Sequence, residues 1–192
     1  MNTPSHAILN LVIFHQQLRD QASPAIIIGA VLPDVPIFVF YLLMKFVYRL
    51  SSSQIWSEVY YQPFWQGIVS TFHSLPLALL GVLIANFWNW HLIKVGLISM
   101  VLHSVLDFPV HNNDAHRHFF PLSNYRFISP VSYWDSNHYG AIAALGEILL
   151  VLGATIYLLP TTETSWSKGL LIAVNLLYFI GYYRFYLKSK SD

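Results

Sequence analysis

The sequence predicts an all-α fold, a polytopic integral membrane helix bundle with about four full spans plus a short N-terminal helix. Hydrophobic residues make up 55% of the 192 residues, and the mean hydropathy is +0.50. Soluble globular chains contain only about 45–50% apolar residues. Six Trp, twelve Tyr and thirteen Phe are typical of the aromatic belts at membrane interfaces.

Composition also limits the chemistry and the partners. A chain of 192 residues is one domain's worth, so residues 1–192 are treated as a single membrane domain. The chain has no cysteine, which leaves metal binding to His, Asp and Glu. A formal net charge of +1 gives no electrostatic case for a nucleic acid partner. The expected partners are the lipid bilayer and a small-molecule or lipid substrate whose identity stays open.

The first part of the chain contains a short helix and an interrupted one. Residues 6–18 are predicted to be helical, with Thr3 or Ser5 as the N-cap, and are too short for a comfortable span. Because the start, Met-Asn-Thr-Pro-Ser-His, lacks the basic region of a signal peptide, no cleavage is expected. Residues 24–48 form a long apolar run in which two prolines surround a carboxylate, and this predicts a kinked or interrupted helix.

Apolar runs further along the chain predict the remaining spans. They are expected at residues 67–90, 92–110, 141–160 and 167–187, the last two filling the C-terminal part 140–187. Residues 50–66 are a polar and aromatic connection, and residues 111–139 are a long His-rich polar loop.

Lys and Arg near the span ends predict the orientation. Alternating the spans backwards from the C-terminus places the span ends rich in Lys and Arg on one side of the membrane, which we take as the cytoplasm. The protein is therefore expected in the cell's inner membrane, with the His-rich loop and the C-terminus on the cytoplasmic side. These cations are Lys45, Arg49, Arg117, Arg126, Arg184, Lys188 and Lys190. The opposite side has fewer, namely Arg19, Lys94 and Lys168.

Ligand-type side chains concentrate between positions 103 and 118. His103 and Asp107 lie four residues apart and so share one face of a helix. Asp114 and His118 repeat this spacing, with His111 and His116 between them. Imidazole and carboxylate groups suit zinc and other divalent first-row metals. The window therefore predicts a divalent-metal site, with zinc as the first choice and manganese or iron as alternatives.

The topology brings further ligands to the same level. His73 lies near the start of the second span, and His103 and Asp107 lie near the end of the third. Since these two span ends are on the same side, all three residues fall within roughly 10–15 Å of one membrane boundary. Asp34 lies at the break in the first span, and an N-terminus starting on this side would bring His6 to the same depth. Ionisable groups inside membrane spans are functional by default.

Each of these residues also has a structural interpretation. Asp34 could cap the helix break, and His73 could simply hydrogen-bond between helices. His6 could be an exposed terminal residue, and the His103/Asp107 pair a hydrogen bond at a helix end. The loop residues could be solvated, and Arg117 and Arg126 could only mark topology. A bundle joined by such polar contacts would need no metal.

Four short motifs occur in order within residues 3–135: Ser5-His6, Gly29-Ala-Val-Leu-Pro33-Asp34, Phe72-His73-Ser74-Leu75 and Leu102-His103-Ser-Val-Leu-Asp107. This pattern resembles the bacterial membrane-bound metal-dependent hydrolase family, which includes LexA-regulated inner-membrane proteins and is distantly similar to zinc-dependent phospholipase C. The resemblance implies that the metal-binding positions of that family correspond here to His6, Asp34, His73, His103 and Asp107.

The sequence departs from the family pattern at two places. Pro36 stands where the family has a second acid after Pro-Asp, and Trp65-Gln-Gly replaces a His-Arg-Gly element before His73. The ligands lost there are expected to be replaced by loop residues, from the set His111, Asp114, His116 and His118.

The leading function hypothesis is a metal-dependent hydrolase acting on a membrane or interfacial substrate such as a lipid phosphoester. Asp114 or Asp135 would act as general base, and Arg117 or Arg126 would stabilise developing negative charge. The rival hypothesis is a non-catalytic metal-binding membrane protein, with a structural, sensing or transport-accessory role. Whether the chain is an enzyme depends on whether the site is open to a substrate.

Overall fold

The computed structural model describes residues 1–14 and 22–188, and these residues form helices and loops without any β-strand. The fold is thus all-α, as predicted. The α-helices are α1 (Thr3–Ile13), α2 (Ser23–Val31), α3 (Val35–Leu42), α4 (Ser52–Gln54), α5 (Pro63–Phe72), α6 (Leu75–Phe87), α7 (His91–Asp107), α8 (Gly140–Leu158) and α9 (Ser165–Tyr182). The predicted helix 6–18 corresponds to α1, and residues 15–18 lie outside the described part of the chain.

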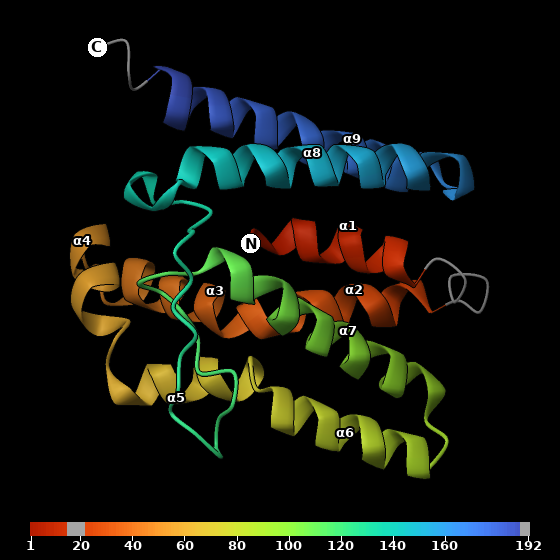
Figure 1. The fold of residues 1–192 in the computed structure, drawn as a ribbon, viewed down its shortest axis with the longest axis horizontal. Coiled ribbons are helices and arrows are strands. Elements are labelled where there is room, and N and C mark those ends of the chain that lie inside the picture. The colour runs from red at the N-terminus through yellow and green to blue at the C-terminus, as the bar shows by residue number, and fades with distance from the viewer. Residues whose placement is uncertain (15–21, 189–192) are drawn as a thin grey trace.

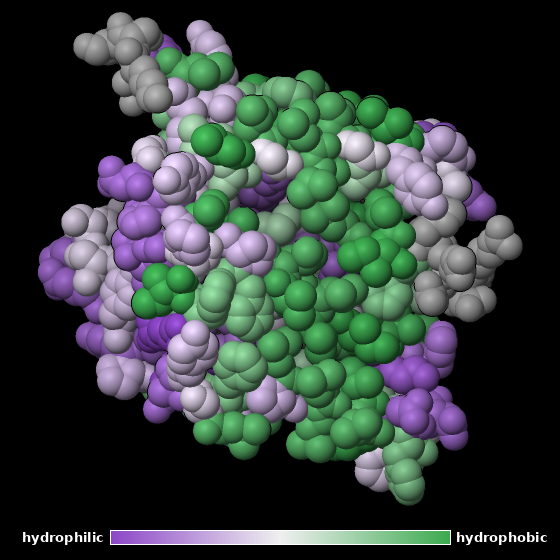
Figure 2. All heavy atoms as spheres, in the orientation of Figure 1, coloured by the Kyte–Doolittle hydropathy of each residue, from purple (hydrophilic) through white to green (hydrophobic). Residues whose placement is uncertain are grey.

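Five stretches of the described residues are long and apolar enough to cross a membrane: Ser23–Val47, Pro63–Phe87, His91–Val110, Gly140–Thr161 and Ser165–Leu187. This is one more than the predicted count of about four, because the first run continues through its prolines and qualifies as a full span. Apolar residues form a broad band across the middle of the molecular surface, with polar residues gathered at both ends (Figure 2). The composition and this band define a membrane protein.

The long helices run roughly parallel and antiparallel to one another in layers (Figure 1). The pair α8 and α9 covers α1, and α1 in turn packs on α2. On the next layer α7 contacts both α2 and α6. The polar segment with α4 and the loop between α7 and α8 lie at the same end of the bundle (Figure 1).

Helix α1 is a short helix packed between α2 and α8. Its Ile8 is buried against Val151, Ala154 and Leu158 of α8 and Leu171 of α9. The N-terminus lies in the middle of the molecule, beside the end of α7 (Figure 1). His6 is consequently inside the bundle rather than on an exposed terminus, and its exposed fraction is 0%.

The first span is interrupted where its prolines predict. Proline lacks a backbone N–H and its ring clashes with the carbonyl four residues earlier. The helix accordingly passes through a 3-10 turn, Leu32–Asp34, between α2 and α3. The interruption places Asp34 at a bend facing the interior of the bundle.

The second span is also interrupted, although a single helix over 67–90 was predicted. Helix α5 ends at Phe72 and α6 begins at Leu75, with the Ser74 side chain accepting the backbone N–H of Leu77 as an N-cap. Pro76 in the first turn of α6 accounts for the break, because its ring would clash with the carbonyl of Phe72 in a continuous helix. His73 therefore lies at a break in its span.

Helices α2 and α7 cross at close range because of one glycine. A Cβ on Gly29 would lie 1.9 Å from the carbonyl oxygen of Gly96, so only glycine allows this approach. The close packing lets two side chains of α7 reach backbone carbonyls of α2: Ser99 donates to Ile26 at 2.7 Å, and His103 contacts Ala30.

The loop of residues 111–139 is folded against the ends of α5 and α7. Its backbone pairs with itself through Ser129 N–H and the His111 carbonyl at 2.9 Å, and with the end of the third span through Tyr133 N–H and the Val110 carbonyl at 3.0 Å. The Asn112 side chain also donates to the carbonyl of Ser129. These bonds hold the first residues of the loop over the His/Asp cluster.

Candidate metal centre

Six ligand-type side chains from five segments meet in one cluster. They form three overlapping groups whose ligand atoms lie within 4.8 Å of one another: His6/His103/Asp107, Asp34/His73/His103 and His73/Asp107/His116. The tetrahedral arrangement common for zinc requires ligand atoms about 3.4 Å apart, given metal–ligand distances of about 2.1 Å. The predicted convergence of these segments is thus present in the structure.

His73 and His103 are held in the tautomer that suits a metal ligand. Nδ1 of His103 lies 2.6 Å from the carbonyl oxygen of Ala30, and Nδ1 of His73 lies 2.9 Å from that of Val69. Since a carbonyl can only accept, each Nδ1 must carry the hydrogen, and each neutral ring presents a lone pair at Nε2. Metal-binding imidazoles are typically oriented in this way.

The Nε2 atoms of these rings face carboxylates without a hydrogen-bond partner. Those of His6, His73 and His103 are buried and unpaired among the described residues. His103 Nε2 lies 3.1 Å from Asp107 Oδ2, and His6 Nε2 lies 3.0 Å from Asp107 Oδ1. For His103, whose ring hydrogen is at Nδ1, the Nε2 lone pair facing a carboxylate is repelled unless a cation lies between them. The donor set therefore fits a divalent ion.

Asp107 is the centre of the cluster. It is 1% exposed, and its Oδ1 lies 2.7 Å from the Met1 amino group and 3.2 Å from His111 Nε2. His73 Nε2 is 3.9 Å from the other oxygen. A carboxylate buried in a membrane span persists only with such a concentration of compensating groups.

Asp34 faces the cluster from the interrupted first span. Its Oδ1 lies 3.5 Å from His73 Nε2 and 3.7 Å from His103 Nε2, while Oδ2 accepts the Thr3 hydroxyl at 2.5 Å. Its side chain makes no capping bond to α3. The interpretation of Asp34 as a helix cap is thus wrong.

The loop contributes His116 to the cluster, whereas His111, also predicted as a ligand, lies outside the three groups and pairs with Asp114. The His116 ring stacks on His73 with centroids 4.0 Å apart. Burial, together with the neighbouring His73 and His111, holds the pKa of His116 well below its usual value, so the ring is neutral at neutral pH and has a free lone pair. His111 Nδ1 lies 2.8 Å from Asp114 Oδ2.

Asp114 is ionised and has one free oxygen. Burial raises its pKa, but hydrogen bonds from His111 and from Trp134 outweigh burial and lower the pKa below its usual value. Trp134 Nε1 donates to Oδ2 at 3.1 Å, whereas Oδ1 has no hydrogen-bond partner among the described residues. That oxygen is buried and accepts no hydrogen bond from the described residues.

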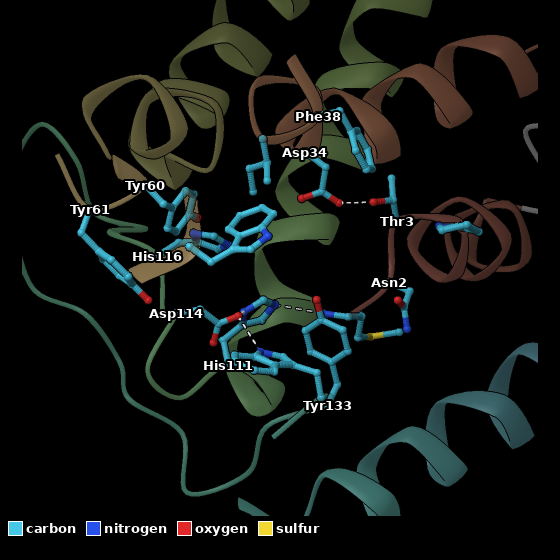
Figure 3. A pocket seen from close by; sticks show the side chains of 15 residues that line it. Asn2, Thr3, Asp34, Phe38, Tyr60, Tyr61, His111, Asp114, His116 and Tyr133 are labelled. Atoms are coloured by element: carbon cyan, nitrogen blue, oxygen red, sulfur yellow. Dashed lines mark hydrogen bonds and ion pairs between the residues drawn. The ribbon is translucent and has the colours of Figure 1, made fainter. Parts of the chain in front are cut away.

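The cluster lies beside a cavity of about 710 Å³. Asp34, His111, Asp114 and His116 line one part of it, and Figure 3 shows them turned toward the same space. The rest of the lining is mainly aromatic or apolar: Ile37, Phe38, Trp56, Tyr60, Tyr61, Tyr133 and Trp134. No Lys or Arg is among the described lining residues.

His118, although predicted as a ligand, lies outside the three groups. Its ring stacks on Phe108 with centroids 4.4 Å apart, and its Nδ1 lies 3.3 Å from the carbonyl oxygen of His73. Its own carbonyl accepts the N–H of Leu75 at 2.8 Å. His118 therefore satisfies the backbone groups freed by the break between α5 and α6.

The other predicted catalytic residues lie away from the cavity lining. Arg117 donates to the Ser70 hydroxyl at 2.9 Å, and Arg126 to Gln66 at 3.1 Å, so both fasten the loop to α5. Asp135 lies 2.8 Å from His138 Nδ1 and accepts the N–H of Asn137. Of the four, only Asp114 lines the cavity.

Sequence reasoning missed most of the cavity wall. The aromatic residues between positions 56 and 61 belong to the segment predicted as a polar and aromatic connection, and Tyr133 and Trp134 to the predicted His-rich loop. The signal that could have identified them was their density in two polar segments that the topology places at the same membrane boundary.

Comparisons with protein-family models, with curated proteins and with solved structures found no match.

Proposed function

We propose that this protein is a membrane-bound metal-dependent hydrolase whose substrate is an amphiphile, such as a lipid phosphoester, drawn from the bilayer. The observation that carries the proposal is the set of three buried, unpaired Nε2 atoms facing two carboxylates beside a cavity. The resemblance to the membrane-bound metal-dependent hydrolases of bacteria supports the same conclusion.

The ligand groups favour two ions. Each imidazole gives one nitrogen to one ion, so groups that share a ring cannot be filled together. The first and third groups share no ring and have only Asp107 in common, so their residues could hold two ions. Asp34, whose Oδ1 lies near both His73 and His103, would help to hold these two ions. Two ions about 3.5–4 Å apart are a common arrangement in phosphoester hydrolysis.

A divalent ion, zinc being our first choice, supplies Lewis acidity and lowers the pKa of a water molecule enough to make a nucleophile near neutral pH. Asp114 would accept the proton through its free Oδ1, and His111 and Trp134 would hold the carboxylate in place. The Thr3 hydroxyl fixes the orientation of Asp34. Arg117 and Arg126 are assigned to loop anchoring rather than to charge stabilisation.

The shape of the cavity supports an amphiphilic substrate. A volume of about 710 Å³ is within the usual range of ligand pockets, and suits a polar head with the first part of an apolar chain. Phe38, in the first span, is 51% exposed, and Trp56, Tyr61 and Trp134 are 41–46% exposed. An apolar chain would leave the cavity past these residues into the bilayer.

A second candidate is a non-catalytic metal-binding membrane protein. It is favoured by the enclosure of Asp107, which has the Met1 amino group and four imidazole nitrogens within 3.9 Å. A closed set of protein ligands is typical of structural sites.

Two measurements on the detergent-purified protein test both functions. Elemental analysis gives the bound metal, and phosphoester lipids in mixed micelles are assayed for hydrolysis with and without a chelator. Bound metal with chelator-sensitive hydrolysis supports the enzyme. Bound metal without hydrolysis supports the second candidate, and a folded protein that takes up no metal contradicts both.

We further propose that the protein resides in the inner membrane with the 111–139 loop and the end of α9 in the cytoplasm. Lys45, Arg49, Arg117, Arg126 and Arg184 belong to segments at this end of the bundle (Figure 1). Lys190 and Arg19 lie outside the described residues. The asymmetry follows the positive-inside rule.

A further inference from the structure

Glu147 is a buried acid that the proposed mechanism does not use. It lies in α8, inside a candidate membrane span, and is 4% exposed. Its Oε1 accepts the backbone N–H of Asn2 at 2.8 Å and the Ser5 hydroxyl at 2.5 Å. The Asn2 side-chain amide contacts both carboxylate oxygens at 3.2 Å. All these donors come from the N-cap residue and the first turn of α1.

The carboxylate supplies what the start of α1 lacks. The first N–H groups of a helix have no intrahelical partner and carry partial positive charge. In α1 the N-cap side chain of Asn2 makes no capping bond, and the first turn contains no acidic residue. Glu147 supplies the negative charge and the acceptor from a neighbouring helix instead.

A third helix joins the same contact. The Ser5 hydroxyl also lies 2.8 Å from the hydroxyl of Tyr178 in α9. The start of α1 is thus held by the pair α8–α9, on the side opposite the metal cluster. Ser5 directly precedes His6, so this anchor is one residue from a proposed ligand.

His6 depends on this anchor more than the other imidazoles do. His73 and His103 are oriented by hydrogen bonds from Nδ1 to carbonyl groups. Nδ1 of His6 has no partner among the described residues, and its ring is located by stacking on His103 at 3.7 Å between centroids. Its position is therefore set by the position of α1 itself.

We propose that Glu147 is a positioning residue of the metal centre, holding the first turn of α1 so that His6 reaches its ligand position. This rests on the proposed metal centre. It gives the two C-terminal spans a part in the site, although they carry none of its ligands.

The first test measures the position of α1 and needs no metal. The chain has no cysteine, so spin labels can be attached at Ile13→Cys and Ile156→Cys, which replace side chains 56% and 62% exposed on α1 and α8. We expect Glu147→Leu to broaden or shift the distance distribution between the labels. Glu147→Gln keeps one acceptor oxygen and should preserve it. An unchanged distribution in Glu147→Leu overturns the proposal.

The second test is a double-mutant cycle on cobalt(II) affinity. Loss of an outer contact to a metal ligand costs about 10–100-fold in affinity, and we expect this loss for Glu147→Leu in the protein that retains His6. In the His6→Ala background Glu147→Leu should change affinity by less than about twofold, because both act through one group. Equal losses in the two backgrounds overturn the proposal.

Asn175→Leu is the matched control, since it removes buried hydrogen bonds to Thr155 and Leu171 within the same two helices. It should leave both the label distances and the cobalt affinity unchanged. Ser5→Ala is the milder variant should Glu147→Leu fail to fold, and it should give an intermediate loss. If the unsubstituted protein binds no cobalt, the proposed metal centre fails, whereas the label distances still decide whether Glu147 holds α1.

Discussion

Nε2 of His103 lies 3.1 Å from Oδ2 of Asp107, one helical turn further along α7. The opposite ring nitrogen is bound to the carbonyl of Ala30 on α2. The pair is therefore fixed by the crossing of two helices, and it presents a lone pair to a carboxylate in a nearly water-free interior. Only a cation, either a proton or a metal ion, makes such a pair stable.

We expect His103→Ala/Asp107→Ala to abolish metal binding. This double variant removes members of all three ligand groups. Elemental analysis of the purified variant should show only background metal.

His91→Ala is the control for this experiment, because His91 is exposed at the start of the same helix. It should retain the full metal content. Wild-type metal content in the double variant would contradict the assignment of the cluster as a metal centre.

His116 and His118 provide a matched pair of loop histidines. His116→Ala should reduce the metal content by about half, because only one of the two proposed ions uses this ring. His118→Ala should keep both ions and instead lower the unfolding free energy by about 1 kcal/mol, through loss of its contact with the His73 carbonyl. Metal analysis and thermal unfolding in detergent distinguish these outcomes, and loss of metal only in His118→Ala would reverse the assignment.

The apolar runs and part of the candidate site could be predicted from the sequence for physical reasons. Span length and hydropathy are determined by the bilayer, so the apolar runs translate directly into helices. His103 and Asp107 share a helix face by spacing alone, and Asp34 is located by the prolines around it. These features depend on residues that are close together in the sequence, so a single sequence is enough to predict them.

Contacts between distant segments could not be predicted in this way. His116 and His118 are two residues apart in an irregular loop, where no period determines which ring turns inward, and only the fold shows that His116 joins the cluster. Glu147 contacts Asn2 and Ser5 across more than 140 positions. Pro76 could have predicted the break at His73, but the long apolar run around it favoured a continuous span.

Gly29→Ala should destabilise the protein and weaken metal binding. The new Cβ would lie 1.9 Å from the Gly96 carbonyl, forcing α2 and α7 apart and disturbing the bond between His103 and Ala30. We expect a loss of about 1–3 kcal/mol in unfolding free energy. Gly153→Ala is the control, since its Cβ would meet nothing within 4 Å. Equal thermal midpoints for the two variants would contradict this account of the helix crossing.

The proposed orientation can be measured by labelling single cysteines in a chain that otherwise has none. Leu122→Cys lies in the long loop, where the native side chain is 81% exposed, and Glu163→Cys lies in the connection between α8 and α9. An impermeant maleimide applied to intact spheroplasts should label Glu163→Cys and spare Leu122→Cys until the membrane is opened. The reverse pattern would invert the topology.

Asp114→Asn should separate metal binding from turnover. Asp114 lines the cavity and its Oδ1 accepts no hydrogen bond from the described residues, whereas it belongs to none of the three ligand groups. Loss of a general base typically costs about 10²–10⁴-fold in rate, so hydrolysis of a phosphoester lipid should fall by that factor with metal content unchanged. Asp135→Asn is the matched substitution outside the cavity, where the carboxylate pairs with His138, and it should retain wild-type turnover. Should the two variants lose activity equally, or Asp114→Asn keep it, the proton acceptor must be another group, and Asp34 would be the next carboxylate of the cavity to test.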